Sequence, residues 1–320
     1  MSSGSESKPG SGSSGAPASS SGPQIRMEPA NQPAQPLPSA TVIVVRERPE
    51  RRPNRFELFM VRRADRSSFM GGAHVFPGGR VEDIDLEPEV RTYCDGTDIA
   101  IRNLPDMSEE TAIGYHLAAL RELFEEAGVL LARDSQGQLA SFEDAEARLR
   151  FGGYRVSAQQ FSLPLVMILK EEGLRFDLSC LTPWSWWVTP AEEKKRFDAR
   201  FFLAIMPSGQ EGLHDGQETT QSHWFTPTEA IEQYKAHEIH LVPPTLRTLQ
   251  ELSRFETIED LLAHARTKKI SRIQPRLVMN GETLQILLPG DPEHPADASE
   301  AVEGDTRFVM EQGRWWSRKG

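Results

Sequence analysis

The chain has 320 residues, with 36 basic and 47 acidic side chains and a formal net charge of -11. This acidic balance argues against general nucleic-acid binding, because phosphates attract positive protein surfaces. Two cysteines, Cys94 and Cys180, are too few for a disulfide framework or a zinc knuckle, and no apolar run is long enough to span a membrane. We therefore expect a protein of a reducing compartment, with no nucleic-acid partner and no membrane partner.

Residues 1–38 are rich in Ser, Gly and Pro and carry almost no bulky apolar side chain. Such a segment cannot offset its ordering entropy by burial, so we predict that it is disordered. It also lacks the apolar core of a signal peptide. The folded part of the chain is predicted to begin at residue 39.

The first folded elements are predicted to be strands that lead to a glycine turn. Ala40–Val45 is typical of a buried strand, and Phe56–Val61 alternates enough to pair with it. A further strand around Val75 runs into the double glycine Gly78-Gly79. Glycines at such a turn let the backbone approach a ligand or a metal closely.

A helix that carries three glutamates is the most informative segment. It is predicted to begin near Ser108 and to end at Gly128, which suits a left-handed cap. Glu122, Glu125 and Glu126 lie at i, i+3 and i+4, so they crowd one face of the helix. Like charges this close repel by about 0.2–0.5 kcal/mol per pair, and magnesium, which prefers carboxylate oxygens, would remove that penalty. The cluster predicts a magnesium site, and a solvated acidic face is the alternative.

The remaining pattern alternates between helices and strands. Residues 86–110 contain prolines and many charges, and we interpret them as a surface excursion. The later predictions are helices over residues 143–150, 157–172, 244–254 and 257–266, a helix after the capping box Thr226–Glu229, strands over residues 181–189, 200–205 and 223–225, and hairpins at Asn280-Gly281 and over residues 308–316. This order predicts an α/β/α sandwich around a mixed β-sheet.

The glycine turn and the glutamate helix together resemble the Nudix box, Gly-x5-Glu-x7-Arg-Glu-U-x-Glu-Glu-x-Gly-U, where U is aliphatic. In the first half Gly79 fits, but Asp85 stands where the pattern has glutamate. Asp85 and Arg121 are 36 positions apart where the pattern expects 8, so 28 residues are inserted inside the box. The second half fits completely, through Arg121, Glu122, Leu123, Glu125, Glu126, Gly128 and Val129.

The segments around the insertion resemble the peroxisomal coenzyme A diphosphatase branch of this superfamily. The likeness lies in residues 72–79, residues 124–131 and the downstream Gln217-Glu218-Thr219, and it covers roughly residues 40–255. It implies a Nudix domain over residues 39–266, an insertion at about 86–113 and a C-terminal extension over 267–320 with hairpins and an acidic loop. The last residues, Ser317–Gly320, are not the peroxisomal Ser-Lys-Leu address, so we expect a cytoplasmic protein.

The resemblance implies a magnesium-dependent hydrolase, with Mn2+ as a substitute, that cuts a diphosphate bond in a nucleotide-linked small molecule. Coenzyme A or acyl-coenzyme A is the first candidate substrate, giving 3',5'-ADP and (acyl)phosphopantetheine. NADH, ADP-ribose and dinucleoside polyphosphates stay open. A non-catalytic nucleotide sensor or scaffold is the alternative from another class, although such proteins usually lose box glutamates and this chain keeps all three. The tail from residue 268 onward offers an interface for a homodimer.

The resemblance also implies the roles of individual residues. Glu122 and Glu126 bind the metal, helped by Glu125 and by the carbonyl near Gly78, and Arg121 fixes the direction of a neighbouring carboxylate. Asp85 replaces the supporting glutamate and is one methylene shorter.

The general base and the substrate contacts are less closely specified. Glu122 and Glu218 are both candidates for the base. Candidate substrate contacts are Arg62, Arg63, His74, Gly79 and Arg200. For the arginines the alternative is a solvated side chain, and for His74 it is a core or edge histidine.

Overall fold

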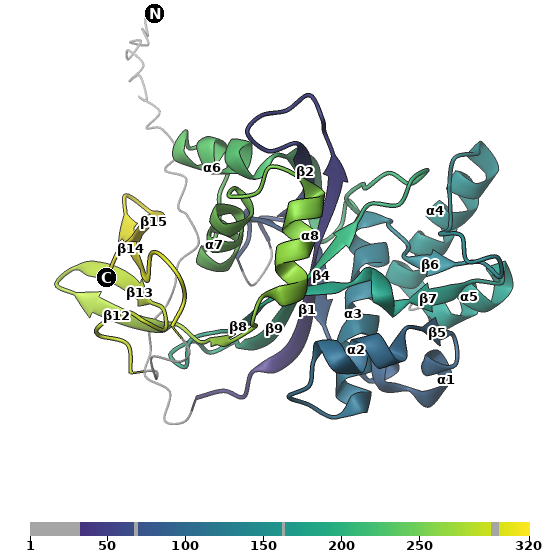
Figure 1. Ribbon diagram of the computed structural model, residues 1–320, viewed down its shortest axis with the longest axis horizontal. Coiled ribbons are helices and arrows are strands. Elements are labelled where there is room, and N and C mark those ends of the chain that lie inside the picture. Colours follow the sequence, from purple (N-terminus) through teal and green to yellow (C-terminus); the bar gives the residue numbers. More distant parts are fainter. Residues whose placement is uncertain (1–32, 67–69, 162–163, 296–300) are drawn as a thin grey trace, which may run out of the picture.

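The computed structural model describes residues 33–66, 70–161, 164–295 and 301–320 (Figure 1). The segment predicted to be disordered is residues 1–38. Residues 1–32 of it lie outside the described residues, as do residues 296–300 of the predicted acidic loop, whereas Leu37 and Pro38 already belong to the first strand of the structure. Within the described ranges, no helix combines the length and the hydropathy that crossing a bilayer requires.

An eight-stranded mixed sheet forms the centre of the molecule (Figure 1). Its central strand β1 (Leu37–Glu47) runs parallel to β9 (Phe197–Ile205) along one edge. On the other edge β1 pairs with β4 (Gly78–Arg80) near its start and with β2 (Phe56–Arg63) near its end. The sheet is completed by β3 (His74–Val75) and β10 (Thr219–Phe225) beside β2, by β8 (Thr182–Val188) beside β9, and by β11 (Arg272–Ile273) beside β8.

Helices cover both faces of this sheet. The glutamate helix α3 (Glu109–Ala127) packs on one face, where Val42 and Val44 of β1 share a core with Leu120. The opposite face, with Ile43 of β1, is covered by α6 (Pro227–Lys235), α7 (Pro243–Leu252) and α8 (Ile258–Thr267). Alternate residues of one strand thus enter two different cores. The predicted α/β/α sandwich around a mixed sheet is confirmed.

The inserted segment folds into the domain, so the predicted surface excursion is wrong. The 3-10 turn η1 (Asp83–Leu86) leads into the segment, which contains α1 (Pro88–Arg91), β5 (Cys94–Asp95) and α2 (Thr97–Asn103). Val90, Cys94, Ala100 and Leu104 are buried in the same core as α3. Pro88 starts a short helix instead of marking a loop, because the first helical position needs no N–H donor.

A second, three-stranded sheet joins the insertion to the chain that follows α3. In it β5 pairs with β7 (Arg175–Asp177), which pairs with β6 (Ala132–Arg133). The helix α5 (Leu165–Glu172) and the 3-10 turn η2 (Leu178–Cys180) contact this sheet, and α4 (Ala145–Phe161) packs against α3. The sequence predicts one helix that ends at residue 150 and a second that begins at residue 157. In the structure α4 continues through Gly152 and Gly153, and α5 begins only after Pro164, so the predicted boundary is wrong.

The C-terminal residues form a four-stranded sheet of two hairpins, as predicted. Its strands are β12 (Arg276–Asn280), β13 (Thr283–Leu287), β14 (Arg307–Glu311) and β15 (Arg314–Arg318). The hydroxyl of Tyr234 on α6 donates to the carbonyl of Trp315 at 2.9 Å and accepts from its N–H at 2.7 Å. The sheet also shares one apolar core with α6, α7 and α8. The domain boundary at residue 267 stays a prediction.

Candidate active site

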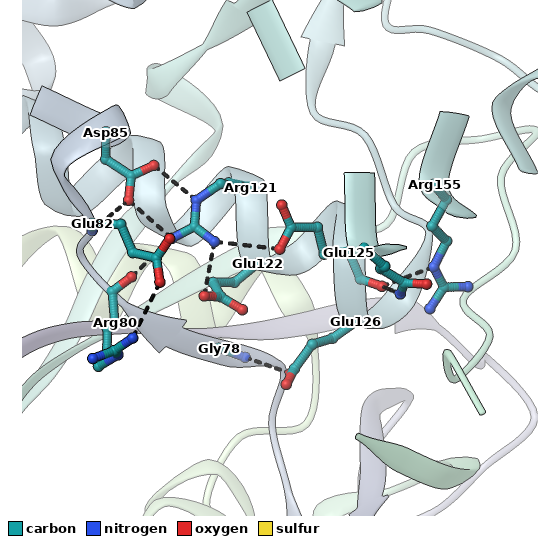
Figure 2. Close-up of polar contacts among 10 residues, drawn as sticks. Gly78, Arg80, Glu82, Asp85, Arg121, Glu122, Glu125, Glu126 and Arg155 are labelled. Carbon is teal, nitrogen blue, oxygen red and sulfur yellow. Dashed lines mark hydrogen bonds and ion pairs between the residues drawn. The ribbon is translucent and has the colours of Figure 1, made fainter. Parts of the chain in front are cut away.

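The glycine turn and the glutamate helix meet in space. The N–H of Gly78 donates to Oε2 of Glu126 at 2.9 Å (Figure 2). The carboxylate of Glu122 lies directly over Gly79, so closely that a Cβ at Gly79 would overlap it. Gly79 is therefore required for the close approach of backbone and carboxylate.

The meeting point lies at a fork in the main sheet. β4 and β2 pair with successive parts of the same edge of β1, so Gly78 lies where the pairing partner of β1 changes. A cavity of about 1550 Å³ opens there. Its wall includes Glu122, Glu125, Glu126 and Gly79, so the predicted metal ligands face one space.

Arg121 organises the carboxylates around it. Its Nε and Nη2 donate to the two carboxylate oxygens of Asp85, each at 2.9 Å, and Nη2 also donates to the carbonyl of Arg80 at 2.8 Å. Its Nη1 donates to Glu122 at 2.9 Å and to Glu125 at 3.3 Å (Figure 2). Asp85 reaches Arg121 although it is shorter than the family's glutamate, because η1 carries it against α3.

Burial controls the electrostatics of the glutamates. It raises the pKa of Glu126, and the neighbouring charge of Glu122 raises that pKa further while the Gly78 N–H opposes the change. Burial likewise raises the pKa of Glu122, against the influence of Arg121 and with that of Glu125. Burial also raises the pKa of Glu125. The negative charges of the half-buried Glu122 and the buried Glu126 are therefore disfavoured, because the protein's own cations compensate them only in part.

This donor set suits a hard divalent cation. Carboxylate and carbonyl oxygens are the ligands that Mg2+ prefers, and a cation would offset the desolvated charges of Glu122 and Glu126. In the structure Glu122 accepts a hydrogen bond from Arg121, and Glu126 accepts one from the N–H of Gly78. Among the described residues, no group of three or more His, Cys, Asp or Glu side chains has the arrangement of a metal centre. The fit therefore rests on donor chemistry and charge.

Two more of the predicted residues lie in the same cavity. Glu218 stands in the loop before β10, exposed to solvent, and its main-chain carbonyl accepts from the N–H of Ala64. Its charge raises the pKa of Glu126, whereas the charge of Arg63 lowers it. Both Glu218 and Arg63 are thus close enough to Glu126 to act on its charge.

Three predicted substrate contacts are not brought to the cavity wall. Arg62 binds Asp65 at 2.6 Å on the solvent side of β2. His74 is buried, with its pKa lowered to about 4 by burial, next to the ring of His223. Arg200 is buried against Asp106 at 2.6 Å and stacks on the ring of Trp186 at 3.6 Å.

Sequence analysis missed two side chains beside the glutamates. Nε of Arg155 donates to the main-chain carbonyl of Glu125 at 2.9 Å (Figure 2). The amide of Gln159 donates to the same carbonyl. Both come from α4, 30 and 34 positions further along the chain. No local pattern marks them, because only tertiary packing brings α4 to the end of α3.

The known proteins that this chain resembles are Nudix hydrolases. The family model of the NUDT19 Nudix domain matches residues 100–254. The acyl-coenzyme A diphosphatase NUDT19 of Gallus gallus is 29% identical over 317 residues, covering 85% of this chain and 82% of the relative. The same enzyme of Homo sapiens is 25% identical over 307 residues, covering 82% and 80%. A Nudix hydrolase structure from Alicyclobacillus acidocaldarius superposes with a TM-score of 0.54 at 27% identity, covering 72% of this chain and 96% of that protein.

Proposed function

The chain belongs to the Nudix hydrolase superfamily, and from that premise we propose that it hydrolyses the diphosphate bond of coenzyme A or acyl-coenzyme A. The products are 3',5'-ADP and phosphopantetheine or its acyl derivative. The observation that carries the proposal is the convergence of the half-buried Glu122 and the buried Glu126 on the glycine turn. The names of the relatives supply the substrate.

The cofactor is proposed to be Mg2+, with Mn2+ as a substitute. Glu122 and Glu126 would hold it, with Glu125 and the carbonyl near Gly78 in support. When bound, the cation supplies charge neutralisation of the diphosphate and lowers the pKa of a coordinated water. Arg121 keeps the carboxylates of Asp85, Glu122 and Glu125 in fixed directions through five hydrogen bonds to side chains and backbone.

The remaining residues bind the substrate and move a proton. We propose that Arg63 binds a substrate phosphate, since it lies in the cavity near Glu126. Water attacks one phosphorus, the bridging P–O bond breaks, and the proton of the water passes to a carboxylate. Glu218 is the first candidate for that base because it is exposed in the cavity, and Glu122 is the second. A reducing compartment, the cytoplasm, is proposed because both cysteines are free thiols.

A substrate panel tests the proposal. The protein is incubated with Mg2+ and coenzyme A, octanoyl-coenzyme A, NADH, ADP-ribose or a diadenosine polyphosphate, and the products are identified by mass spectrometry. We expect 3',5'-ADP from the first two and loss of turnover in Glu126→Gln or with excess EDTA. Equal, weak activity on all five compounds would refute the coenzyme A assignment. Nucleotide binding without turnover would favour the sensor alternative.

A further inference from the structure

The cavity at the proposed active site continues beneath the C-terminal sheet. Besides the glycine turn and the glutamates, its wall includes Leu277, Ile286, Met310 and Trp315 of β12–β15. Small-molecule sites usually measure about 300–1,000 Å³, and this cavity measures about 1550 Å³. The cavity therefore has room for a ligand much longer than a diphosphate.

The C-terminal sheet presents one apolar face to this space. Cross-strand pairing places Met310 opposite Trp315, and Ile286 opposite both Leu277 and Phe308. Side chains of directly paired residues lie on the same face of a sheet. Leu277, Ile286, Phe308 and Trp315 are buried, and Met310 is half-buried against them. Val309, the neighbour of Met310, points to the other face.

Strand register gives the separation, in the plane of the main sheet, between the glycine turn and the apolar part of the cavity, which lies on the face opposite α3. Gly78 pairs with Thr41 on β1, and Thr41 pairs with Phe201 on β9. Trp187 on β8 pairs with Ala199, two residues from Phe201. Neighbouring strands lie about 4.8 Å apart, so the three steps from β4 to β8 span about 15 Å. Both Phe201 and Trp187 line the cavity and belong to the core that the C-terminal sheet shares.

This wall is anchored to the rest of the domain. Tyr234 of α6 both donates to and accepts from the backbone of Trp315, and Nη1 of Arg314 donates to the carbonyl of Ile239 at 3.1 Å. Tyr234 and Trp315 are almost fully buried. A ligand that enters therefore meets a fixed apolar surface, and its length decides how well it fits.

We propose that the C-terminal sheet binds the acyl chain at the end of the pantetheine arm of an acyl-coenzyme A thioester and sets the preference for acyl-chain length. The proposal rests on the proposed function, which places the diphosphate at the glycine turn. The arm is joined directly to that diphosphate and ends in an apolar chain, which matches a cavity that is polar at Glu122 and Glu126 and apolar beneath β12–β15.

The test compares Met310→Trp with two matched controls. Val309→Trp adds the same bulk on the same strand but on the opposite face. Val166→Trp adds it to the other apolar part of the cavity wall, on α5. For each protein, kcat/KM is measured with free coenzyme A and with palmitoyl-coenzyme A below its micellar concentration. We expect Met310→Trp to lower the palmitoyl value about tenfold or more, the scale on which a filled apolar pocket discriminates, and to leave the value for free coenzyme A unchanged.

The proposal is overturned if Met310→Trp lowers kcat/KM equally for both substrates. It is also overturned if Val309→Trp changes the ratio of the two kcat/KM values as much as Met310→Trp does, or if only Val166→Trp changes this ratio. Where the larger side chain prevents folding, Met310→Ala replaces it, and we expect a relative gain for the longest acyl chains. Titration calorimetry with palmitoyl-coenzyme A in EDTA separates this proposal from the reaction. If the wild type binds palmitoyl-coenzyme A but does not hydrolyse it, and Met310→Trp weakens this binding, the proposed reaction is wrong and the acyl site is supported. Turnover without altered chain selectivity would sink the acyl site alone.

Discussion

At the scale of single residues, the site depends on a buried arginine that holds several carboxylates at once. Asp85 gives Arg121 a bidentate partner, and that pair is fully formed although the side chain is shorter than the family's glutamate. Both residues are buried. Removing one partner of a buried ion pair leaves the other uncompensated, which costs about 3–5 kcal/mol. Asp85 therefore acts on the reaction through Arg121, as a positioning residue.

Asp85→Asn should lower activity without removing a proposed metal ligand. The amide would present a donor to the guanidinium of Arg121, so Glu122 and Glu125 would lose their fixed directions. We expect kcat/KM to fall about 10–100-fold, the usual effect of losing a residue that orients a ligand, and the Mg2+ concentration for half activity to rise. Asp83→Asn, exposed in the same turn, is the control and should leave both values unchanged. Asp85→Glu should give no gain, and a gain would contradict this account.

At the scale of elements, the glycine turn and α3, which are far apart in sequence, are in direct contact at Gly79. A Cβ at Gly79 would overlap the carboxylate of Glu122, whereas one at Gly152, in α4, would meet nothing within 4 Å. The glycine turn and α3 must therefore keep their present separation for the site to exist.

Gly79→Ala should therefore displace Glu122 and reduce kcat strongly. The methyl group would push α3 and β4 apart or force the carboxylate into another rotamer, and overpacking of this kind costs about 1–3 kcal/mol. We expect a lower thermal midpoint and a loss of turnover that added Mg2+ does not restore. Gly152→Ala makes the same chemical change inside a helix, where alanine is favoured by about 0.5–1 kcal/mol. It should raise the midpoint and keep full activity. Full activity in Gly79→Ala would show that Glu122 is not held at the turn.

How much the sequence could predict also depends on the kind of element. The glutamate helix, its Ser108 start and its Gly128 cap were predictable, because helix periodicity and caps are local signals. The insertion was not, since Val90, Cys94 and Ala100 are buried without following a helix or strand period. Arg62 and Arg63 show a further limit. Adjacent residues of a strand point to opposite faces, and only the fold decides that Arg63 lines the cavity.

At the scale of the whole molecule, the site reduces the stability of the metal-free protein. Burial raises the pKa of Glu122 and of Glu126, so near neutral pH the folded state must hold carboxylates that would ionise more readily when unfolded. Stabilities of domains are only about 5–15 kcal/mol, and a cation that binds the folded state alone would recover part of this cost by mass action. Function and stability are therefore opposed at this site in the absence of metal.

The stability of the metal-free protein should rise as pH falls from about 8 to 6.5. A carboxyl whose folded pKa is raised keeps its proton to higher pH in the folded state than in the unfolded state, so lowering the pH favours folding by up to about 1.4 kcal/mol per pH unit for each such proton. The pKa of His116 is lowered to about 4, so protonation of this histidine favours the unfolded state once the pH falls below its ordinary value of 6.5. This opposing effect sets the lower limit of the pH range at 6.5. Chemical denaturation in EDTA at several pH values measures the slope of the free energy of unfolding against pH.

The double variant Glu122→Gln, Glu126→Gln separates this effect from the general acidity of the chain, whose net charge is -11. It removes both carboxyls and keeps their size, so it should be more stable than the wild type at pH 8 in EDTA and should lose most of the slope. Added Mg2+ should stabilise the wild type most at pH 8, where both carboxylates are closest to full ionisation, and should not stabilise the double variant. An unchanged slope in the double variant would place the effect outside the glutamate pair, and an equal response to Mg2+ would mean that the cation binds elsewhere.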